Sequence, residues 1–160
     1  MAFELAAVTA FIAALSITGK DPAGNNRAVT IKDWSGIDMR ADVRQCPILQ
    51  PDITQPIRLE SVARDSFGDG AIAKQTLYYI VPYVLLYEPV GATRGLVDIL
   101  PNVVATMKAI ITAFIVNDTP GSVSVDLRIA SFTLGGTVID PSGNQFHGAN
   151  IAVRIQEFIN

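Results

Sequence analysis

Side chains suited to nucleophilic or acid–base chemistry are scarce in this chain of 160 residues, which contains one histidine, His147, and one cysteine, Cys46. A catalytic Ser–His or Cys–His pair would have to use that histidine. Nothing in the sequence brings it to Cys46, and a lone cysteine beside a proline, here Pro47, is more often a packing residue. The paired carboxylates of a hydrolase cannot be identified either. We therefore expect no enzymatic activity and no catalytic residues.

Aspartates that could bind a metal ion fall into two groups. Asp33, Asp38 and Asp42 are spread over an irregular segment, and Asp65 and Asp69 flank a Ser-Phe-Gly tripeptide. Neither group matches a calcium-binding loop, and zinc sites need clustered cysteine or histidine ligands. Solvated loops explain both groups, so we expect no metal site.

The glycine-rich run 91–95, Gly-Ala-Thr-Arg-Gly, precedes an apolar stretch but has neither of the two common phosphate-binding patterns. A turn between a strand and a helix explains its glycines. Arg94 could contact an anion there, because a helix N-terminus attracts negative charge. The sequence thus predicts no bound cofactor and leaves Arg94 as a candidate contact residue.

The composition excludes several classes of protein. Charged residues make up 17% of the chain and apolar residues 49%, with a mean hydropathy of +0.35 and a net charge of −3. Such a chain is too apolar to be disordered, and the lack of a basic excess argues against a dedicated nucleic-acid-binding protein. A single cysteine excludes an internal disulfide framework. Subunit interfaces are one way to cover so much apolar surface.

Two apolar segments invite comparison with export signals or membrane spans. Near the N-terminus the first charge is Glu4, and the first basic residue, Lys20, follows the apolar run, which is not the order of a secretory signal. The second segment, 99–116, is interrupted by Pro101 and Lys108, so we expect a buried helix rather than a span. These observations predict no membrane association and use in a reducing cytoplasm.

The hydrophobic patterns predict two helices and several strands. Apolar residues recur at spacings of three and four over 3–16, which predicts a first helix. A second helix is predicted to begin near Asp98, its expected N-cap. Two adjacent stripes of apolar side chains predict that this second helix is mostly buried. β-Branched and aromatic residues dominate 71–89, where Pro82 predicts a bulge or an edge position. Further strands are predicted at 28–32, 57–67, 122–132 and 145–159.

These elements predict one α+β domain covering residues 1–160, in the order α-β-β-β-α-β-β. An antiparallel or mixed β-sheet flanked by two main helices would bury the apolar faces of both kinds of element. Alanines on the outer face of the first helix allow close packing against another body.

Several short segments occur in a characteristic order. A short N-terminal helix leads into the proline-rich 46–51 (Cys-Pro-Ile-Leu-Gln-Pro). There follow 64–68 (Arg-Asp-Ser-Phe-Gly), 86–91 (Leu-Tyr-Glu-Pro-Val-Gly), 94–96 (Arg-Gly-Leu) and 139–148 (Ile-Asp-Pro-Ser-Gly-Asn-Gln-Phe-His-Gly). In this order, over residues 3–160, the chain resembles the tail terminator (tail-to-head joining) proteins of long-tailed bacteriophages. The shared segments have structural roles and are not catalytic signatures.

The resemblance implies a structural virion protein whose hexameric ring caps the tail tube, terminates its polymerisation and joins the tail to the head connector. The implied partners are further copies of the chain, the tail tube protein, the sheath protein where the tail is contractile, and the head-side stopper or connector. DNA would pass through the lumen without specific binding, which a net charge of −3 suits. The implied location is the tail–head junction of the virion, after assembly in the host cytoplasm.

Aromatic residues in loops are candidate anchors for such an interface, with core packing as the alternative for each. The candidate contact residues are Trp34, Phe67, Tyr87, Arg94 and Phe146. Two other functions remain open at this point. One is a head–tail stopper or adaptor of the phage neck, and the other is a small α+β enzyme or ligand-binding domain whose site has no linear motif.

Overall fold

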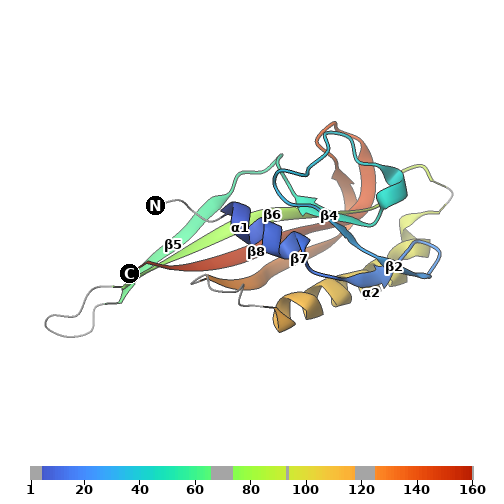
Figure 1. Ribbon diagram of the computed structural model, residues 1–160. Helices are drawn as coiled ribbons and strands as arrows, with labels where there is room; N and C mark the ends of the chain where they lie inside the picture. The colour runs from blue at the N-terminus through green and yellow to red at the C-terminus, as the bar shows by residue number, and fades with distance from the viewer. Residues whose placement is uncertain (1–4, 66–73, 93, 118–124, 160) are drawn as a thin grey trace, which may run out of the picture.

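The computed structural model describes residues 5–65, 74–92, 94–117 and 125–159, and it contains two α-helices and a mixed β-sheet (Figure 1). The chain therefore belongs to the α+β class, as predicted. In chain order the elements are α1 (Leu5–Ala13), β1 (Thr18–Lys20), β2 (Asn26–Ala28), β3 (Thr30–Ile31), the 3-10 turn η1 (Val43–Gln45), β4 (Ile48–Pro51), β5 (Arg58–Asp65), β6 (Lys74–Pro89), α2 (Leu96–Val116), β7 (Val125–Ile139) and β8 (Gln145–Ile159).

The main sheet is built on the long strands β6, β8 and β7, which run antiparallel to one another. Its order is β3-β4-β6-β8-β7, and β5 also pairs with β6. β4 and β5 therefore lie one after the other along the same side of β6, with Pro51 opposite Tyr83 and Arg58 opposite Ile80. The parallel pair β3–β4 makes the sheet mixed, and β1 and β2 form a separate antiparallel pair.

Both helices pack on one face of the main sheet. Alternate side chains of a strand point to the same face, so Tyr83, Leu85 and Tyr87 of β6 all enter this core. One face of each helix packs on these strand side chains, and the residues of this core are almost completely buried. The helical and neighbouring strand residues in this core include Val8, Ile12, Ile99, Val103, Ile110, Phe114, Leu127, Ala149, Ile151, Val153 and Ile155.

A smaller core lies on the opposite face of the sheet, at one end only. It contains Val84 and Leu86 from β6, together with Cys46, Val138 and Phe146. The approach of the strands is close here because β8 carries Gly148: a Cβ atom on that residue would lie 1.8 Å from the carbonyl oxygen of Leu85.

Several local expectations need correction. Six strands rather than three precede α2. The strand expected at 28–32 corresponds to the end of β2 and to β3, whereas β1 and β4, with three and four residues, are too short to show an alternating pattern and were not predicted. The N-cap of α2 is Gly95, not Asp98; Asp98 lies in the first turn, where its carboxylate accepts a hydrogen bond from the N–H of Gly95 (3.2 Å).

Pro82 occupies a local edge position, one of the two arrangements that its sequence context predicted. It pairs with Ala152 of β8, but it lies in the gap between the partners of β4 and β5. Its carbonyl accepts the N–H of Asp52 (2.8 Å) in that gap. The N and O atoms of a strand residue point to the same side, so the missing N–H of Pro82 breaks no ladder bond. The bulge in β6 lies instead between Leu86 and Glu88.

Candidate functional site: two exposed apolar surfaces

The second apolar stripe of α2 is not covered by the sheet. Val103, Ile110 and Phe114, from the first apolar stripe of this helix, are buried as predicted, but Ile115 and Val116 are 70% and 73% exposed. α2 is long and apolar enough to cross a membrane, a test that core helices of soluble proteins also pass, and only 28% of its most apolar stretch is buried. The prediction of a mostly buried helix is therefore wrong, because the sheet covers one stripe and leaves the other open.

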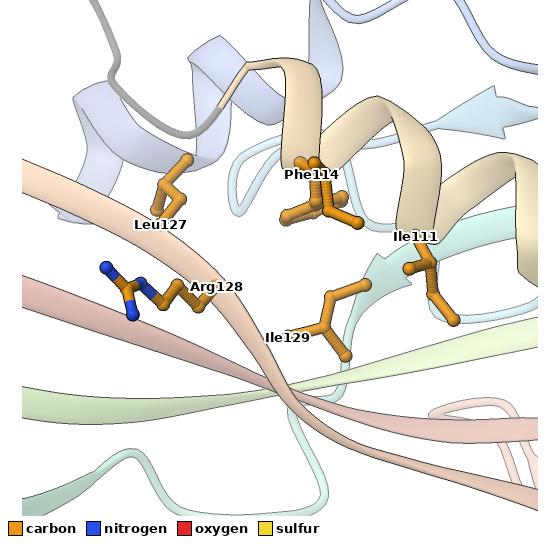
Figure 2. Close-up of a pocket in the computed structure, with 6 residues that line it drawn as sticks. Ile111, Phe114, Leu127, Arg128 and Ile129 are labelled. Atoms are coloured by element: carbon orange, nitrogen blue, oxygen red, sulfur yellow. The ribbon is translucent and has the colours of Figure 1, made fainter.

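An apolar groove runs between the C-terminal half of α2 and the first part of β7 (Figure 2). Its volume is about 320 Å³. Ile111 and Phe114 face it from the helix and Ile129 from the strand, whereas the side chain of Arg128 extends away from Ile111 and Phe114. Ile115, Leu127 and Arg128 complete the lining. We call this surface the α2–β7 groove.

The strand that borders the groove is the last strand of the main sheet. Within the described residues β7 pairs only with β8, so the outer side of β7 has no strand beside it. Long open strand edges favour association with another chain unless they are covered or charged. The groove and the open edge together form a continuous surface without a partner in the described part of this chain.

A second exposed apolar surface lies at the other end of the molecule, where three loops meet. We call it the loop end, and it consists of residues 39–45, 89–92 and 139–145. The N–H of Val90 donates to the carbonyl of Gln145 (3.0 Å), and Ser142 donates through its hydroxyl to the carbonyl of Met39. Met39 and Val43 are 62% and 52% exposed, and Val90 and Ile139 are exposed as well.

A buried carboxylate holds the loop end together. Asp140 is fully buried and accepts hydrogen bonds from the backbone N–H of Ala41 (3.0 Å), Ser142 (3.0 Å) and Asn144 (2.8 Å) and from the side-chain amide of Asn144 (2.9 Å). Burial alone would raise the pKa of this carboxyl group, but these hydrogen bonds outweigh it and the pKa is lowered. Asp140 is therefore charged at neutral pH and joins segments about a hundred residues apart in sequence.

The loop end is also hollowed and carries arginines. A cavity of about 420 Å³ is lined by Arg40, Val43, Val90 and Phe146, among others. An adjoining cavity of about 210 Å³ shares Val43 with it and includes Arg27. This surface thus combines exposed aliphatic side chains with guanidinium groups.

The predicted contact residues lie in different environments. Trp34 is 37% exposed, and Arg94 is exposed at the surface, with a guanidinium nitrogen 3.9 Å from the carboxylate of Glu88. Tyr87 and Phe146 are buried within the chain, so for both the alternative of core packing describes their position. Phe67 lies outside the described residues.

Tyr87 is held in the main core by its hydroxyl group, which donates to the carbonyl of Lys20. Burial raises its pKa to about 12, against the lowering effect of a hydrogen bond with Thr106. Thr106 itself accepts the N–H of Lys20 (2.9 Å), so these two side chains join β1 to α2 and β6. Tyr87 is thus a core residue whose hydroxyl group links β6 to β1.

The histidine and the cysteine lie in environments that do not activate them. Cys46 is buried, and burial raises the pKa of its thiol to about 12, so the reactive thiolate is scarce at neutral pH. Nδ1 of His147 is buried and has no hydrogen-bond partner among the described residues, whereas a general base needs such a partner to fix its tautomer. No group of three metal-ligating side chains occurs in the described part of the chain.

The exposed aliphatic residues were missed by sequence reasoning, which searched for aromatic anchors. For Ile115 a signal existed, because the stripe of Val104, Ile111 and Ile115 makes the apolar face of α2 wider than one packing contact requires. For Met39 and Val43 the sequence gives no such signal, because apolar residues do not recur at a regular spacing in the segment around them.

We compared the chain with known proteins. No protein family, no curated protein and no solved structure matches it.

Proposed function

We propose that this chain is a structural virion protein of a long-tailed bacteriophage, with the fold and role of a tail terminator. Its copies form a ring, which we propose to be hexameric, that caps the tail tube, terminates tail polymerisation and joins the tail to the head connector. We propose no enzymatic reaction and no cofactor for it.

The observation that carries this proposal is the presence of two separate exposed apolar surfaces, the α2–β7 groove and the loop end. A ring is built from heterologous contacts, in which one surface of each copy meets a different surface of the next. A chain with two distinct unpartnered surfaces meets this requirement.

The segments that carry the resemblance give a second line of support. Segment 46–51 supplies Cys46 to the smaller core, 86–91 and 139–148 meet through Val90 and Gln145, and 94–96 begins α2. Residues far apart in the sequence thus contribute to one end of the fold, as expected if the shared segments build a common surface.

The proposed partners follow from the role. They are other copies of this chain, the tail tube protein, the sheath protein if the tail is contractile, and the stopper or connector on the head side. DNA passes through the lumen without specific binding. The proposed location is the tail–head junction of the virion, and assembly takes place in the host cytoplasm.

Deletion of the gene from the phage tests the proposal. Loss of a terminator gives overlong tail tubes and DNA-filled heads without tails, both visible by electron microscopy. Tails of normal length with heads that leak DNA would instead identify a head–tail stopper or adaptor and would overturn the terminator assignment. A normal burst of intact virions would overturn any structural role in the neck.

A further inference from the structure

We propose that the face of the main sheet opposite the helices lines the lumen of the ring and contacts the phosphate groups of double-stranded DNA through Arg58, Arg128 and Arg154. This inference rests on the proposed ring and deepens it, because it names the surface along which the DNA passes. We call this surface the arginine face. Its residues used below are Arg58, Glu60, Arg128, Asn150, Arg154 and Gln156.

The alternation of side chains along β7 and β8 places two of the arginines on this face. Leu127 of β7 and Val153 of β8 are buried in the main core, on the side of the helices. Arg128 and Arg154 follow them directly in sequence, so their side chains point to the opposite face of the sheet. Figure 2 accordingly shows the side chain of Arg128 extending away from Phe114 of α2.

The three arginines lie in one row across four neighbouring strands. In the register of the sheet, Arg58 lies opposite Ile80. Ile80 lies opposite Arg154, and Arg154 lies opposite Arg128. Since neighbouring strands are about 4.8 Å apart, the Cα atoms of this row span about 14 Å. Arg58 and Arg128 are exposed, and the side chain of Arg154 is 40% exposed, so the row can contact more than one phosphate group of a duplex.

The described charges of the arginine face leave an excess of positive charge. Glu60 is the one acidic residue of this face whose side chain the structure describes, and its carboxylate lies 3.0 Å from Nε of Arg154. The guanidinium group of Arg154 also lies over the ring of Tyr78, 4.4 Å from its centroid. One carboxylate thus stands against three guanidinium groups, and Arg154 is held in place over the sheet by two neighbours. Arg128 has an interaction of its own within the chain, which does not remove its charge.

The other side chains of this face favour a nucleic-acid backbone over a protein partner. Protein interfaces usually contain a central cluster of apolar anchors. None of the large apolar side chains that are exposed in the described part of the chain lies on the arginine face. Asn150 and Gln156 lie along the same face of β8 as Arg154 instead. Arginine and amide side chains commonly donate to phosphate oxygens, and such contacts carry no sequence information. The face therefore suits DNA that passes without specific binding.

The place of the arginine face in the fold agrees with a lumen. The exposed apolar side chains that contacts between copies require lie in the α2–β7 groove and at the loop end. The helices cover the other face of the sheet. A polar, positively charged face therefore remains available for DNA when both apolar surfaces are used between copies. Attraction to phosphate groups without base contacts also lets a protein and a duplex slide past each other.

A double variant that keeps the ion pair of Arg154 and Glu60 tests the contact. Binding of the purified protein to a labelled duplex of about 30 base pairs is measured by fluorescence anisotropy at about 50 mM salt and above. R58Q/R128Q should bind at least tenfold more weakly than the wild type. The slope of log K against log salt should become shallower by about 1.8, because each phosphate contact contributes about 0.9.

The matched control is R40Q/R44Q. Arg40 and Arg44 are exposed arginines of the loop end, so this variant changes the net charge by the same amount on another surface. Its affinity for the duplex should stay within about twofold of the wild type, because it removes no phosphate contact. E60Q should bind the duplex more tightly than the wild type, because it removes the carboxylate that neutralises Arg154.

Four results would overturn the inference. Equal losses of affinity in R58Q/R128Q and R40Q/R44Q, with both folded by circular dichroism, would show that binding follows net charge alone. Weaker binding by E60Q, or no binding by the wild type at about 50 mM salt, would contradict a phosphate-binding face. Displacement of the duplex by an equal charge concentration of polyglutamate would assign the face to an acidic protein. The proposed function would stand in each case, since the gene-deletion phenotype decides it independently.

Discussion

Removal of the Asp140 side chain should destabilise the protein strongly, although the residue lies in a turn. The variant D140A leaves the N–H of Ala41 without its acceptor, and Ala41 is buried. A buried donor without a partner costs about 1–3 kcal/mol. Ser142 and Asn144 are exposed, so water replaces their lost hydrogen bonds at a cost of about 1 kcal/mol, similar to the loss of a helix cap. The free energy of unfolding should therefore fall by about 2–4 kcal/mol.

The matched control is D52A. Asp52 is also a buried carboxylate, and it accepts hydrogen bonds from the N–H of Thr54 (3.0 Å) and from the side-chain amide of Gln55 (2.9 Å). Both partners are exposed neighbours in sequence, so water can take over, and we expect a loss of about 1 kcal/mol.

Urea denaturation of both variants, followed by circular dichroism and by the fluorescence of Trp34, gives the two free energies of unfolding. The reasoning is refuted if D140A costs no more than D52A, because the long-range bond to Ala41 would then contribute nothing.

The pH dependence of D140N gives an independent check. The pKa of Asp140 is lowered in the folded protein, chiefly because its hydrogen bonds overcome the effect of burial. A carboxyl group of this kind stabilises the fold above its unfolded pKa of about 3.9, and this contribution is lost as the pH falls through the folded pKa. The difference in unfolding free energy between the wild type and D140N should be constant from about pH 5 to 7 and should shrink below about pH 4. A difference that grows on acidification would contradict the assignment.

Three further changes test other parts of the structure. T106V should lower the free energy of unfolding by about 1–3 kcal/mol, because Thr106 is buried and the partly buried N–H of Lys20 loses its acceptor. The matched T112V, on the exposed side of α2, should cost less than about 0.5 kcal/mol, and thermal melts compare the two variants. Cys46 should react with a thiol reagent at pH 8 only after denaturation, since burial raises its pKa to about 12; rapid labelling of the folded protein would contradict this. G148A should yield little soluble protein, because its Cβ would overlap a carbonyl oxygen of β6, and normal yield and melting temperature would refute that close approach.

The regular elements of this fold could be predicted because their sequences repeat a pattern over many residues. The alternation in β7 and β8 identified Leu127 and Ile155 as buried, and the stripe of Val103 and Ile110 identified the packed side of α2. The amphipathic period also located α1 to within a few residues. Long periodic segments carry this information because each apolar side chain must face the same core.

The loop end could not be predicted, because its structure depends on contacts between distant segments. Residues 140–144 (Asp-Pro-Ser-Gly-Asn) have the composition of a turn, but nothing in them indicates that Asp140 would bind the N–H of Ala41. The peptide bond Cys46–Pro47 is cis, whereas the prolines of this segment indicate only extended or turn geometry. The exposure of Met39 and Val43 is a result of the same long-range packing.

The exposed side chains of the α2–β7 groove and of the loop end are aliphatic, and this has a consequence for the proposed assembly. Two of the aromatic residues predicted as anchors, Tyr87 and Phe146, are inside, and Trp34, which is 37% exposed, lies outside both surfaces. Exposed aliphatic side chains such as Met39, Val43 and Ile115 provide contacts that are individually weaker than those of aromatic anchors. A closed ring compensates, because each copy makes two such contacts and can leave only by breaking both, whereas the end copy of an open chain breaks one. Weak aliphatic contacts therefore favour complete rings over partial ones, which suits a protein that must form a cap of fixed size.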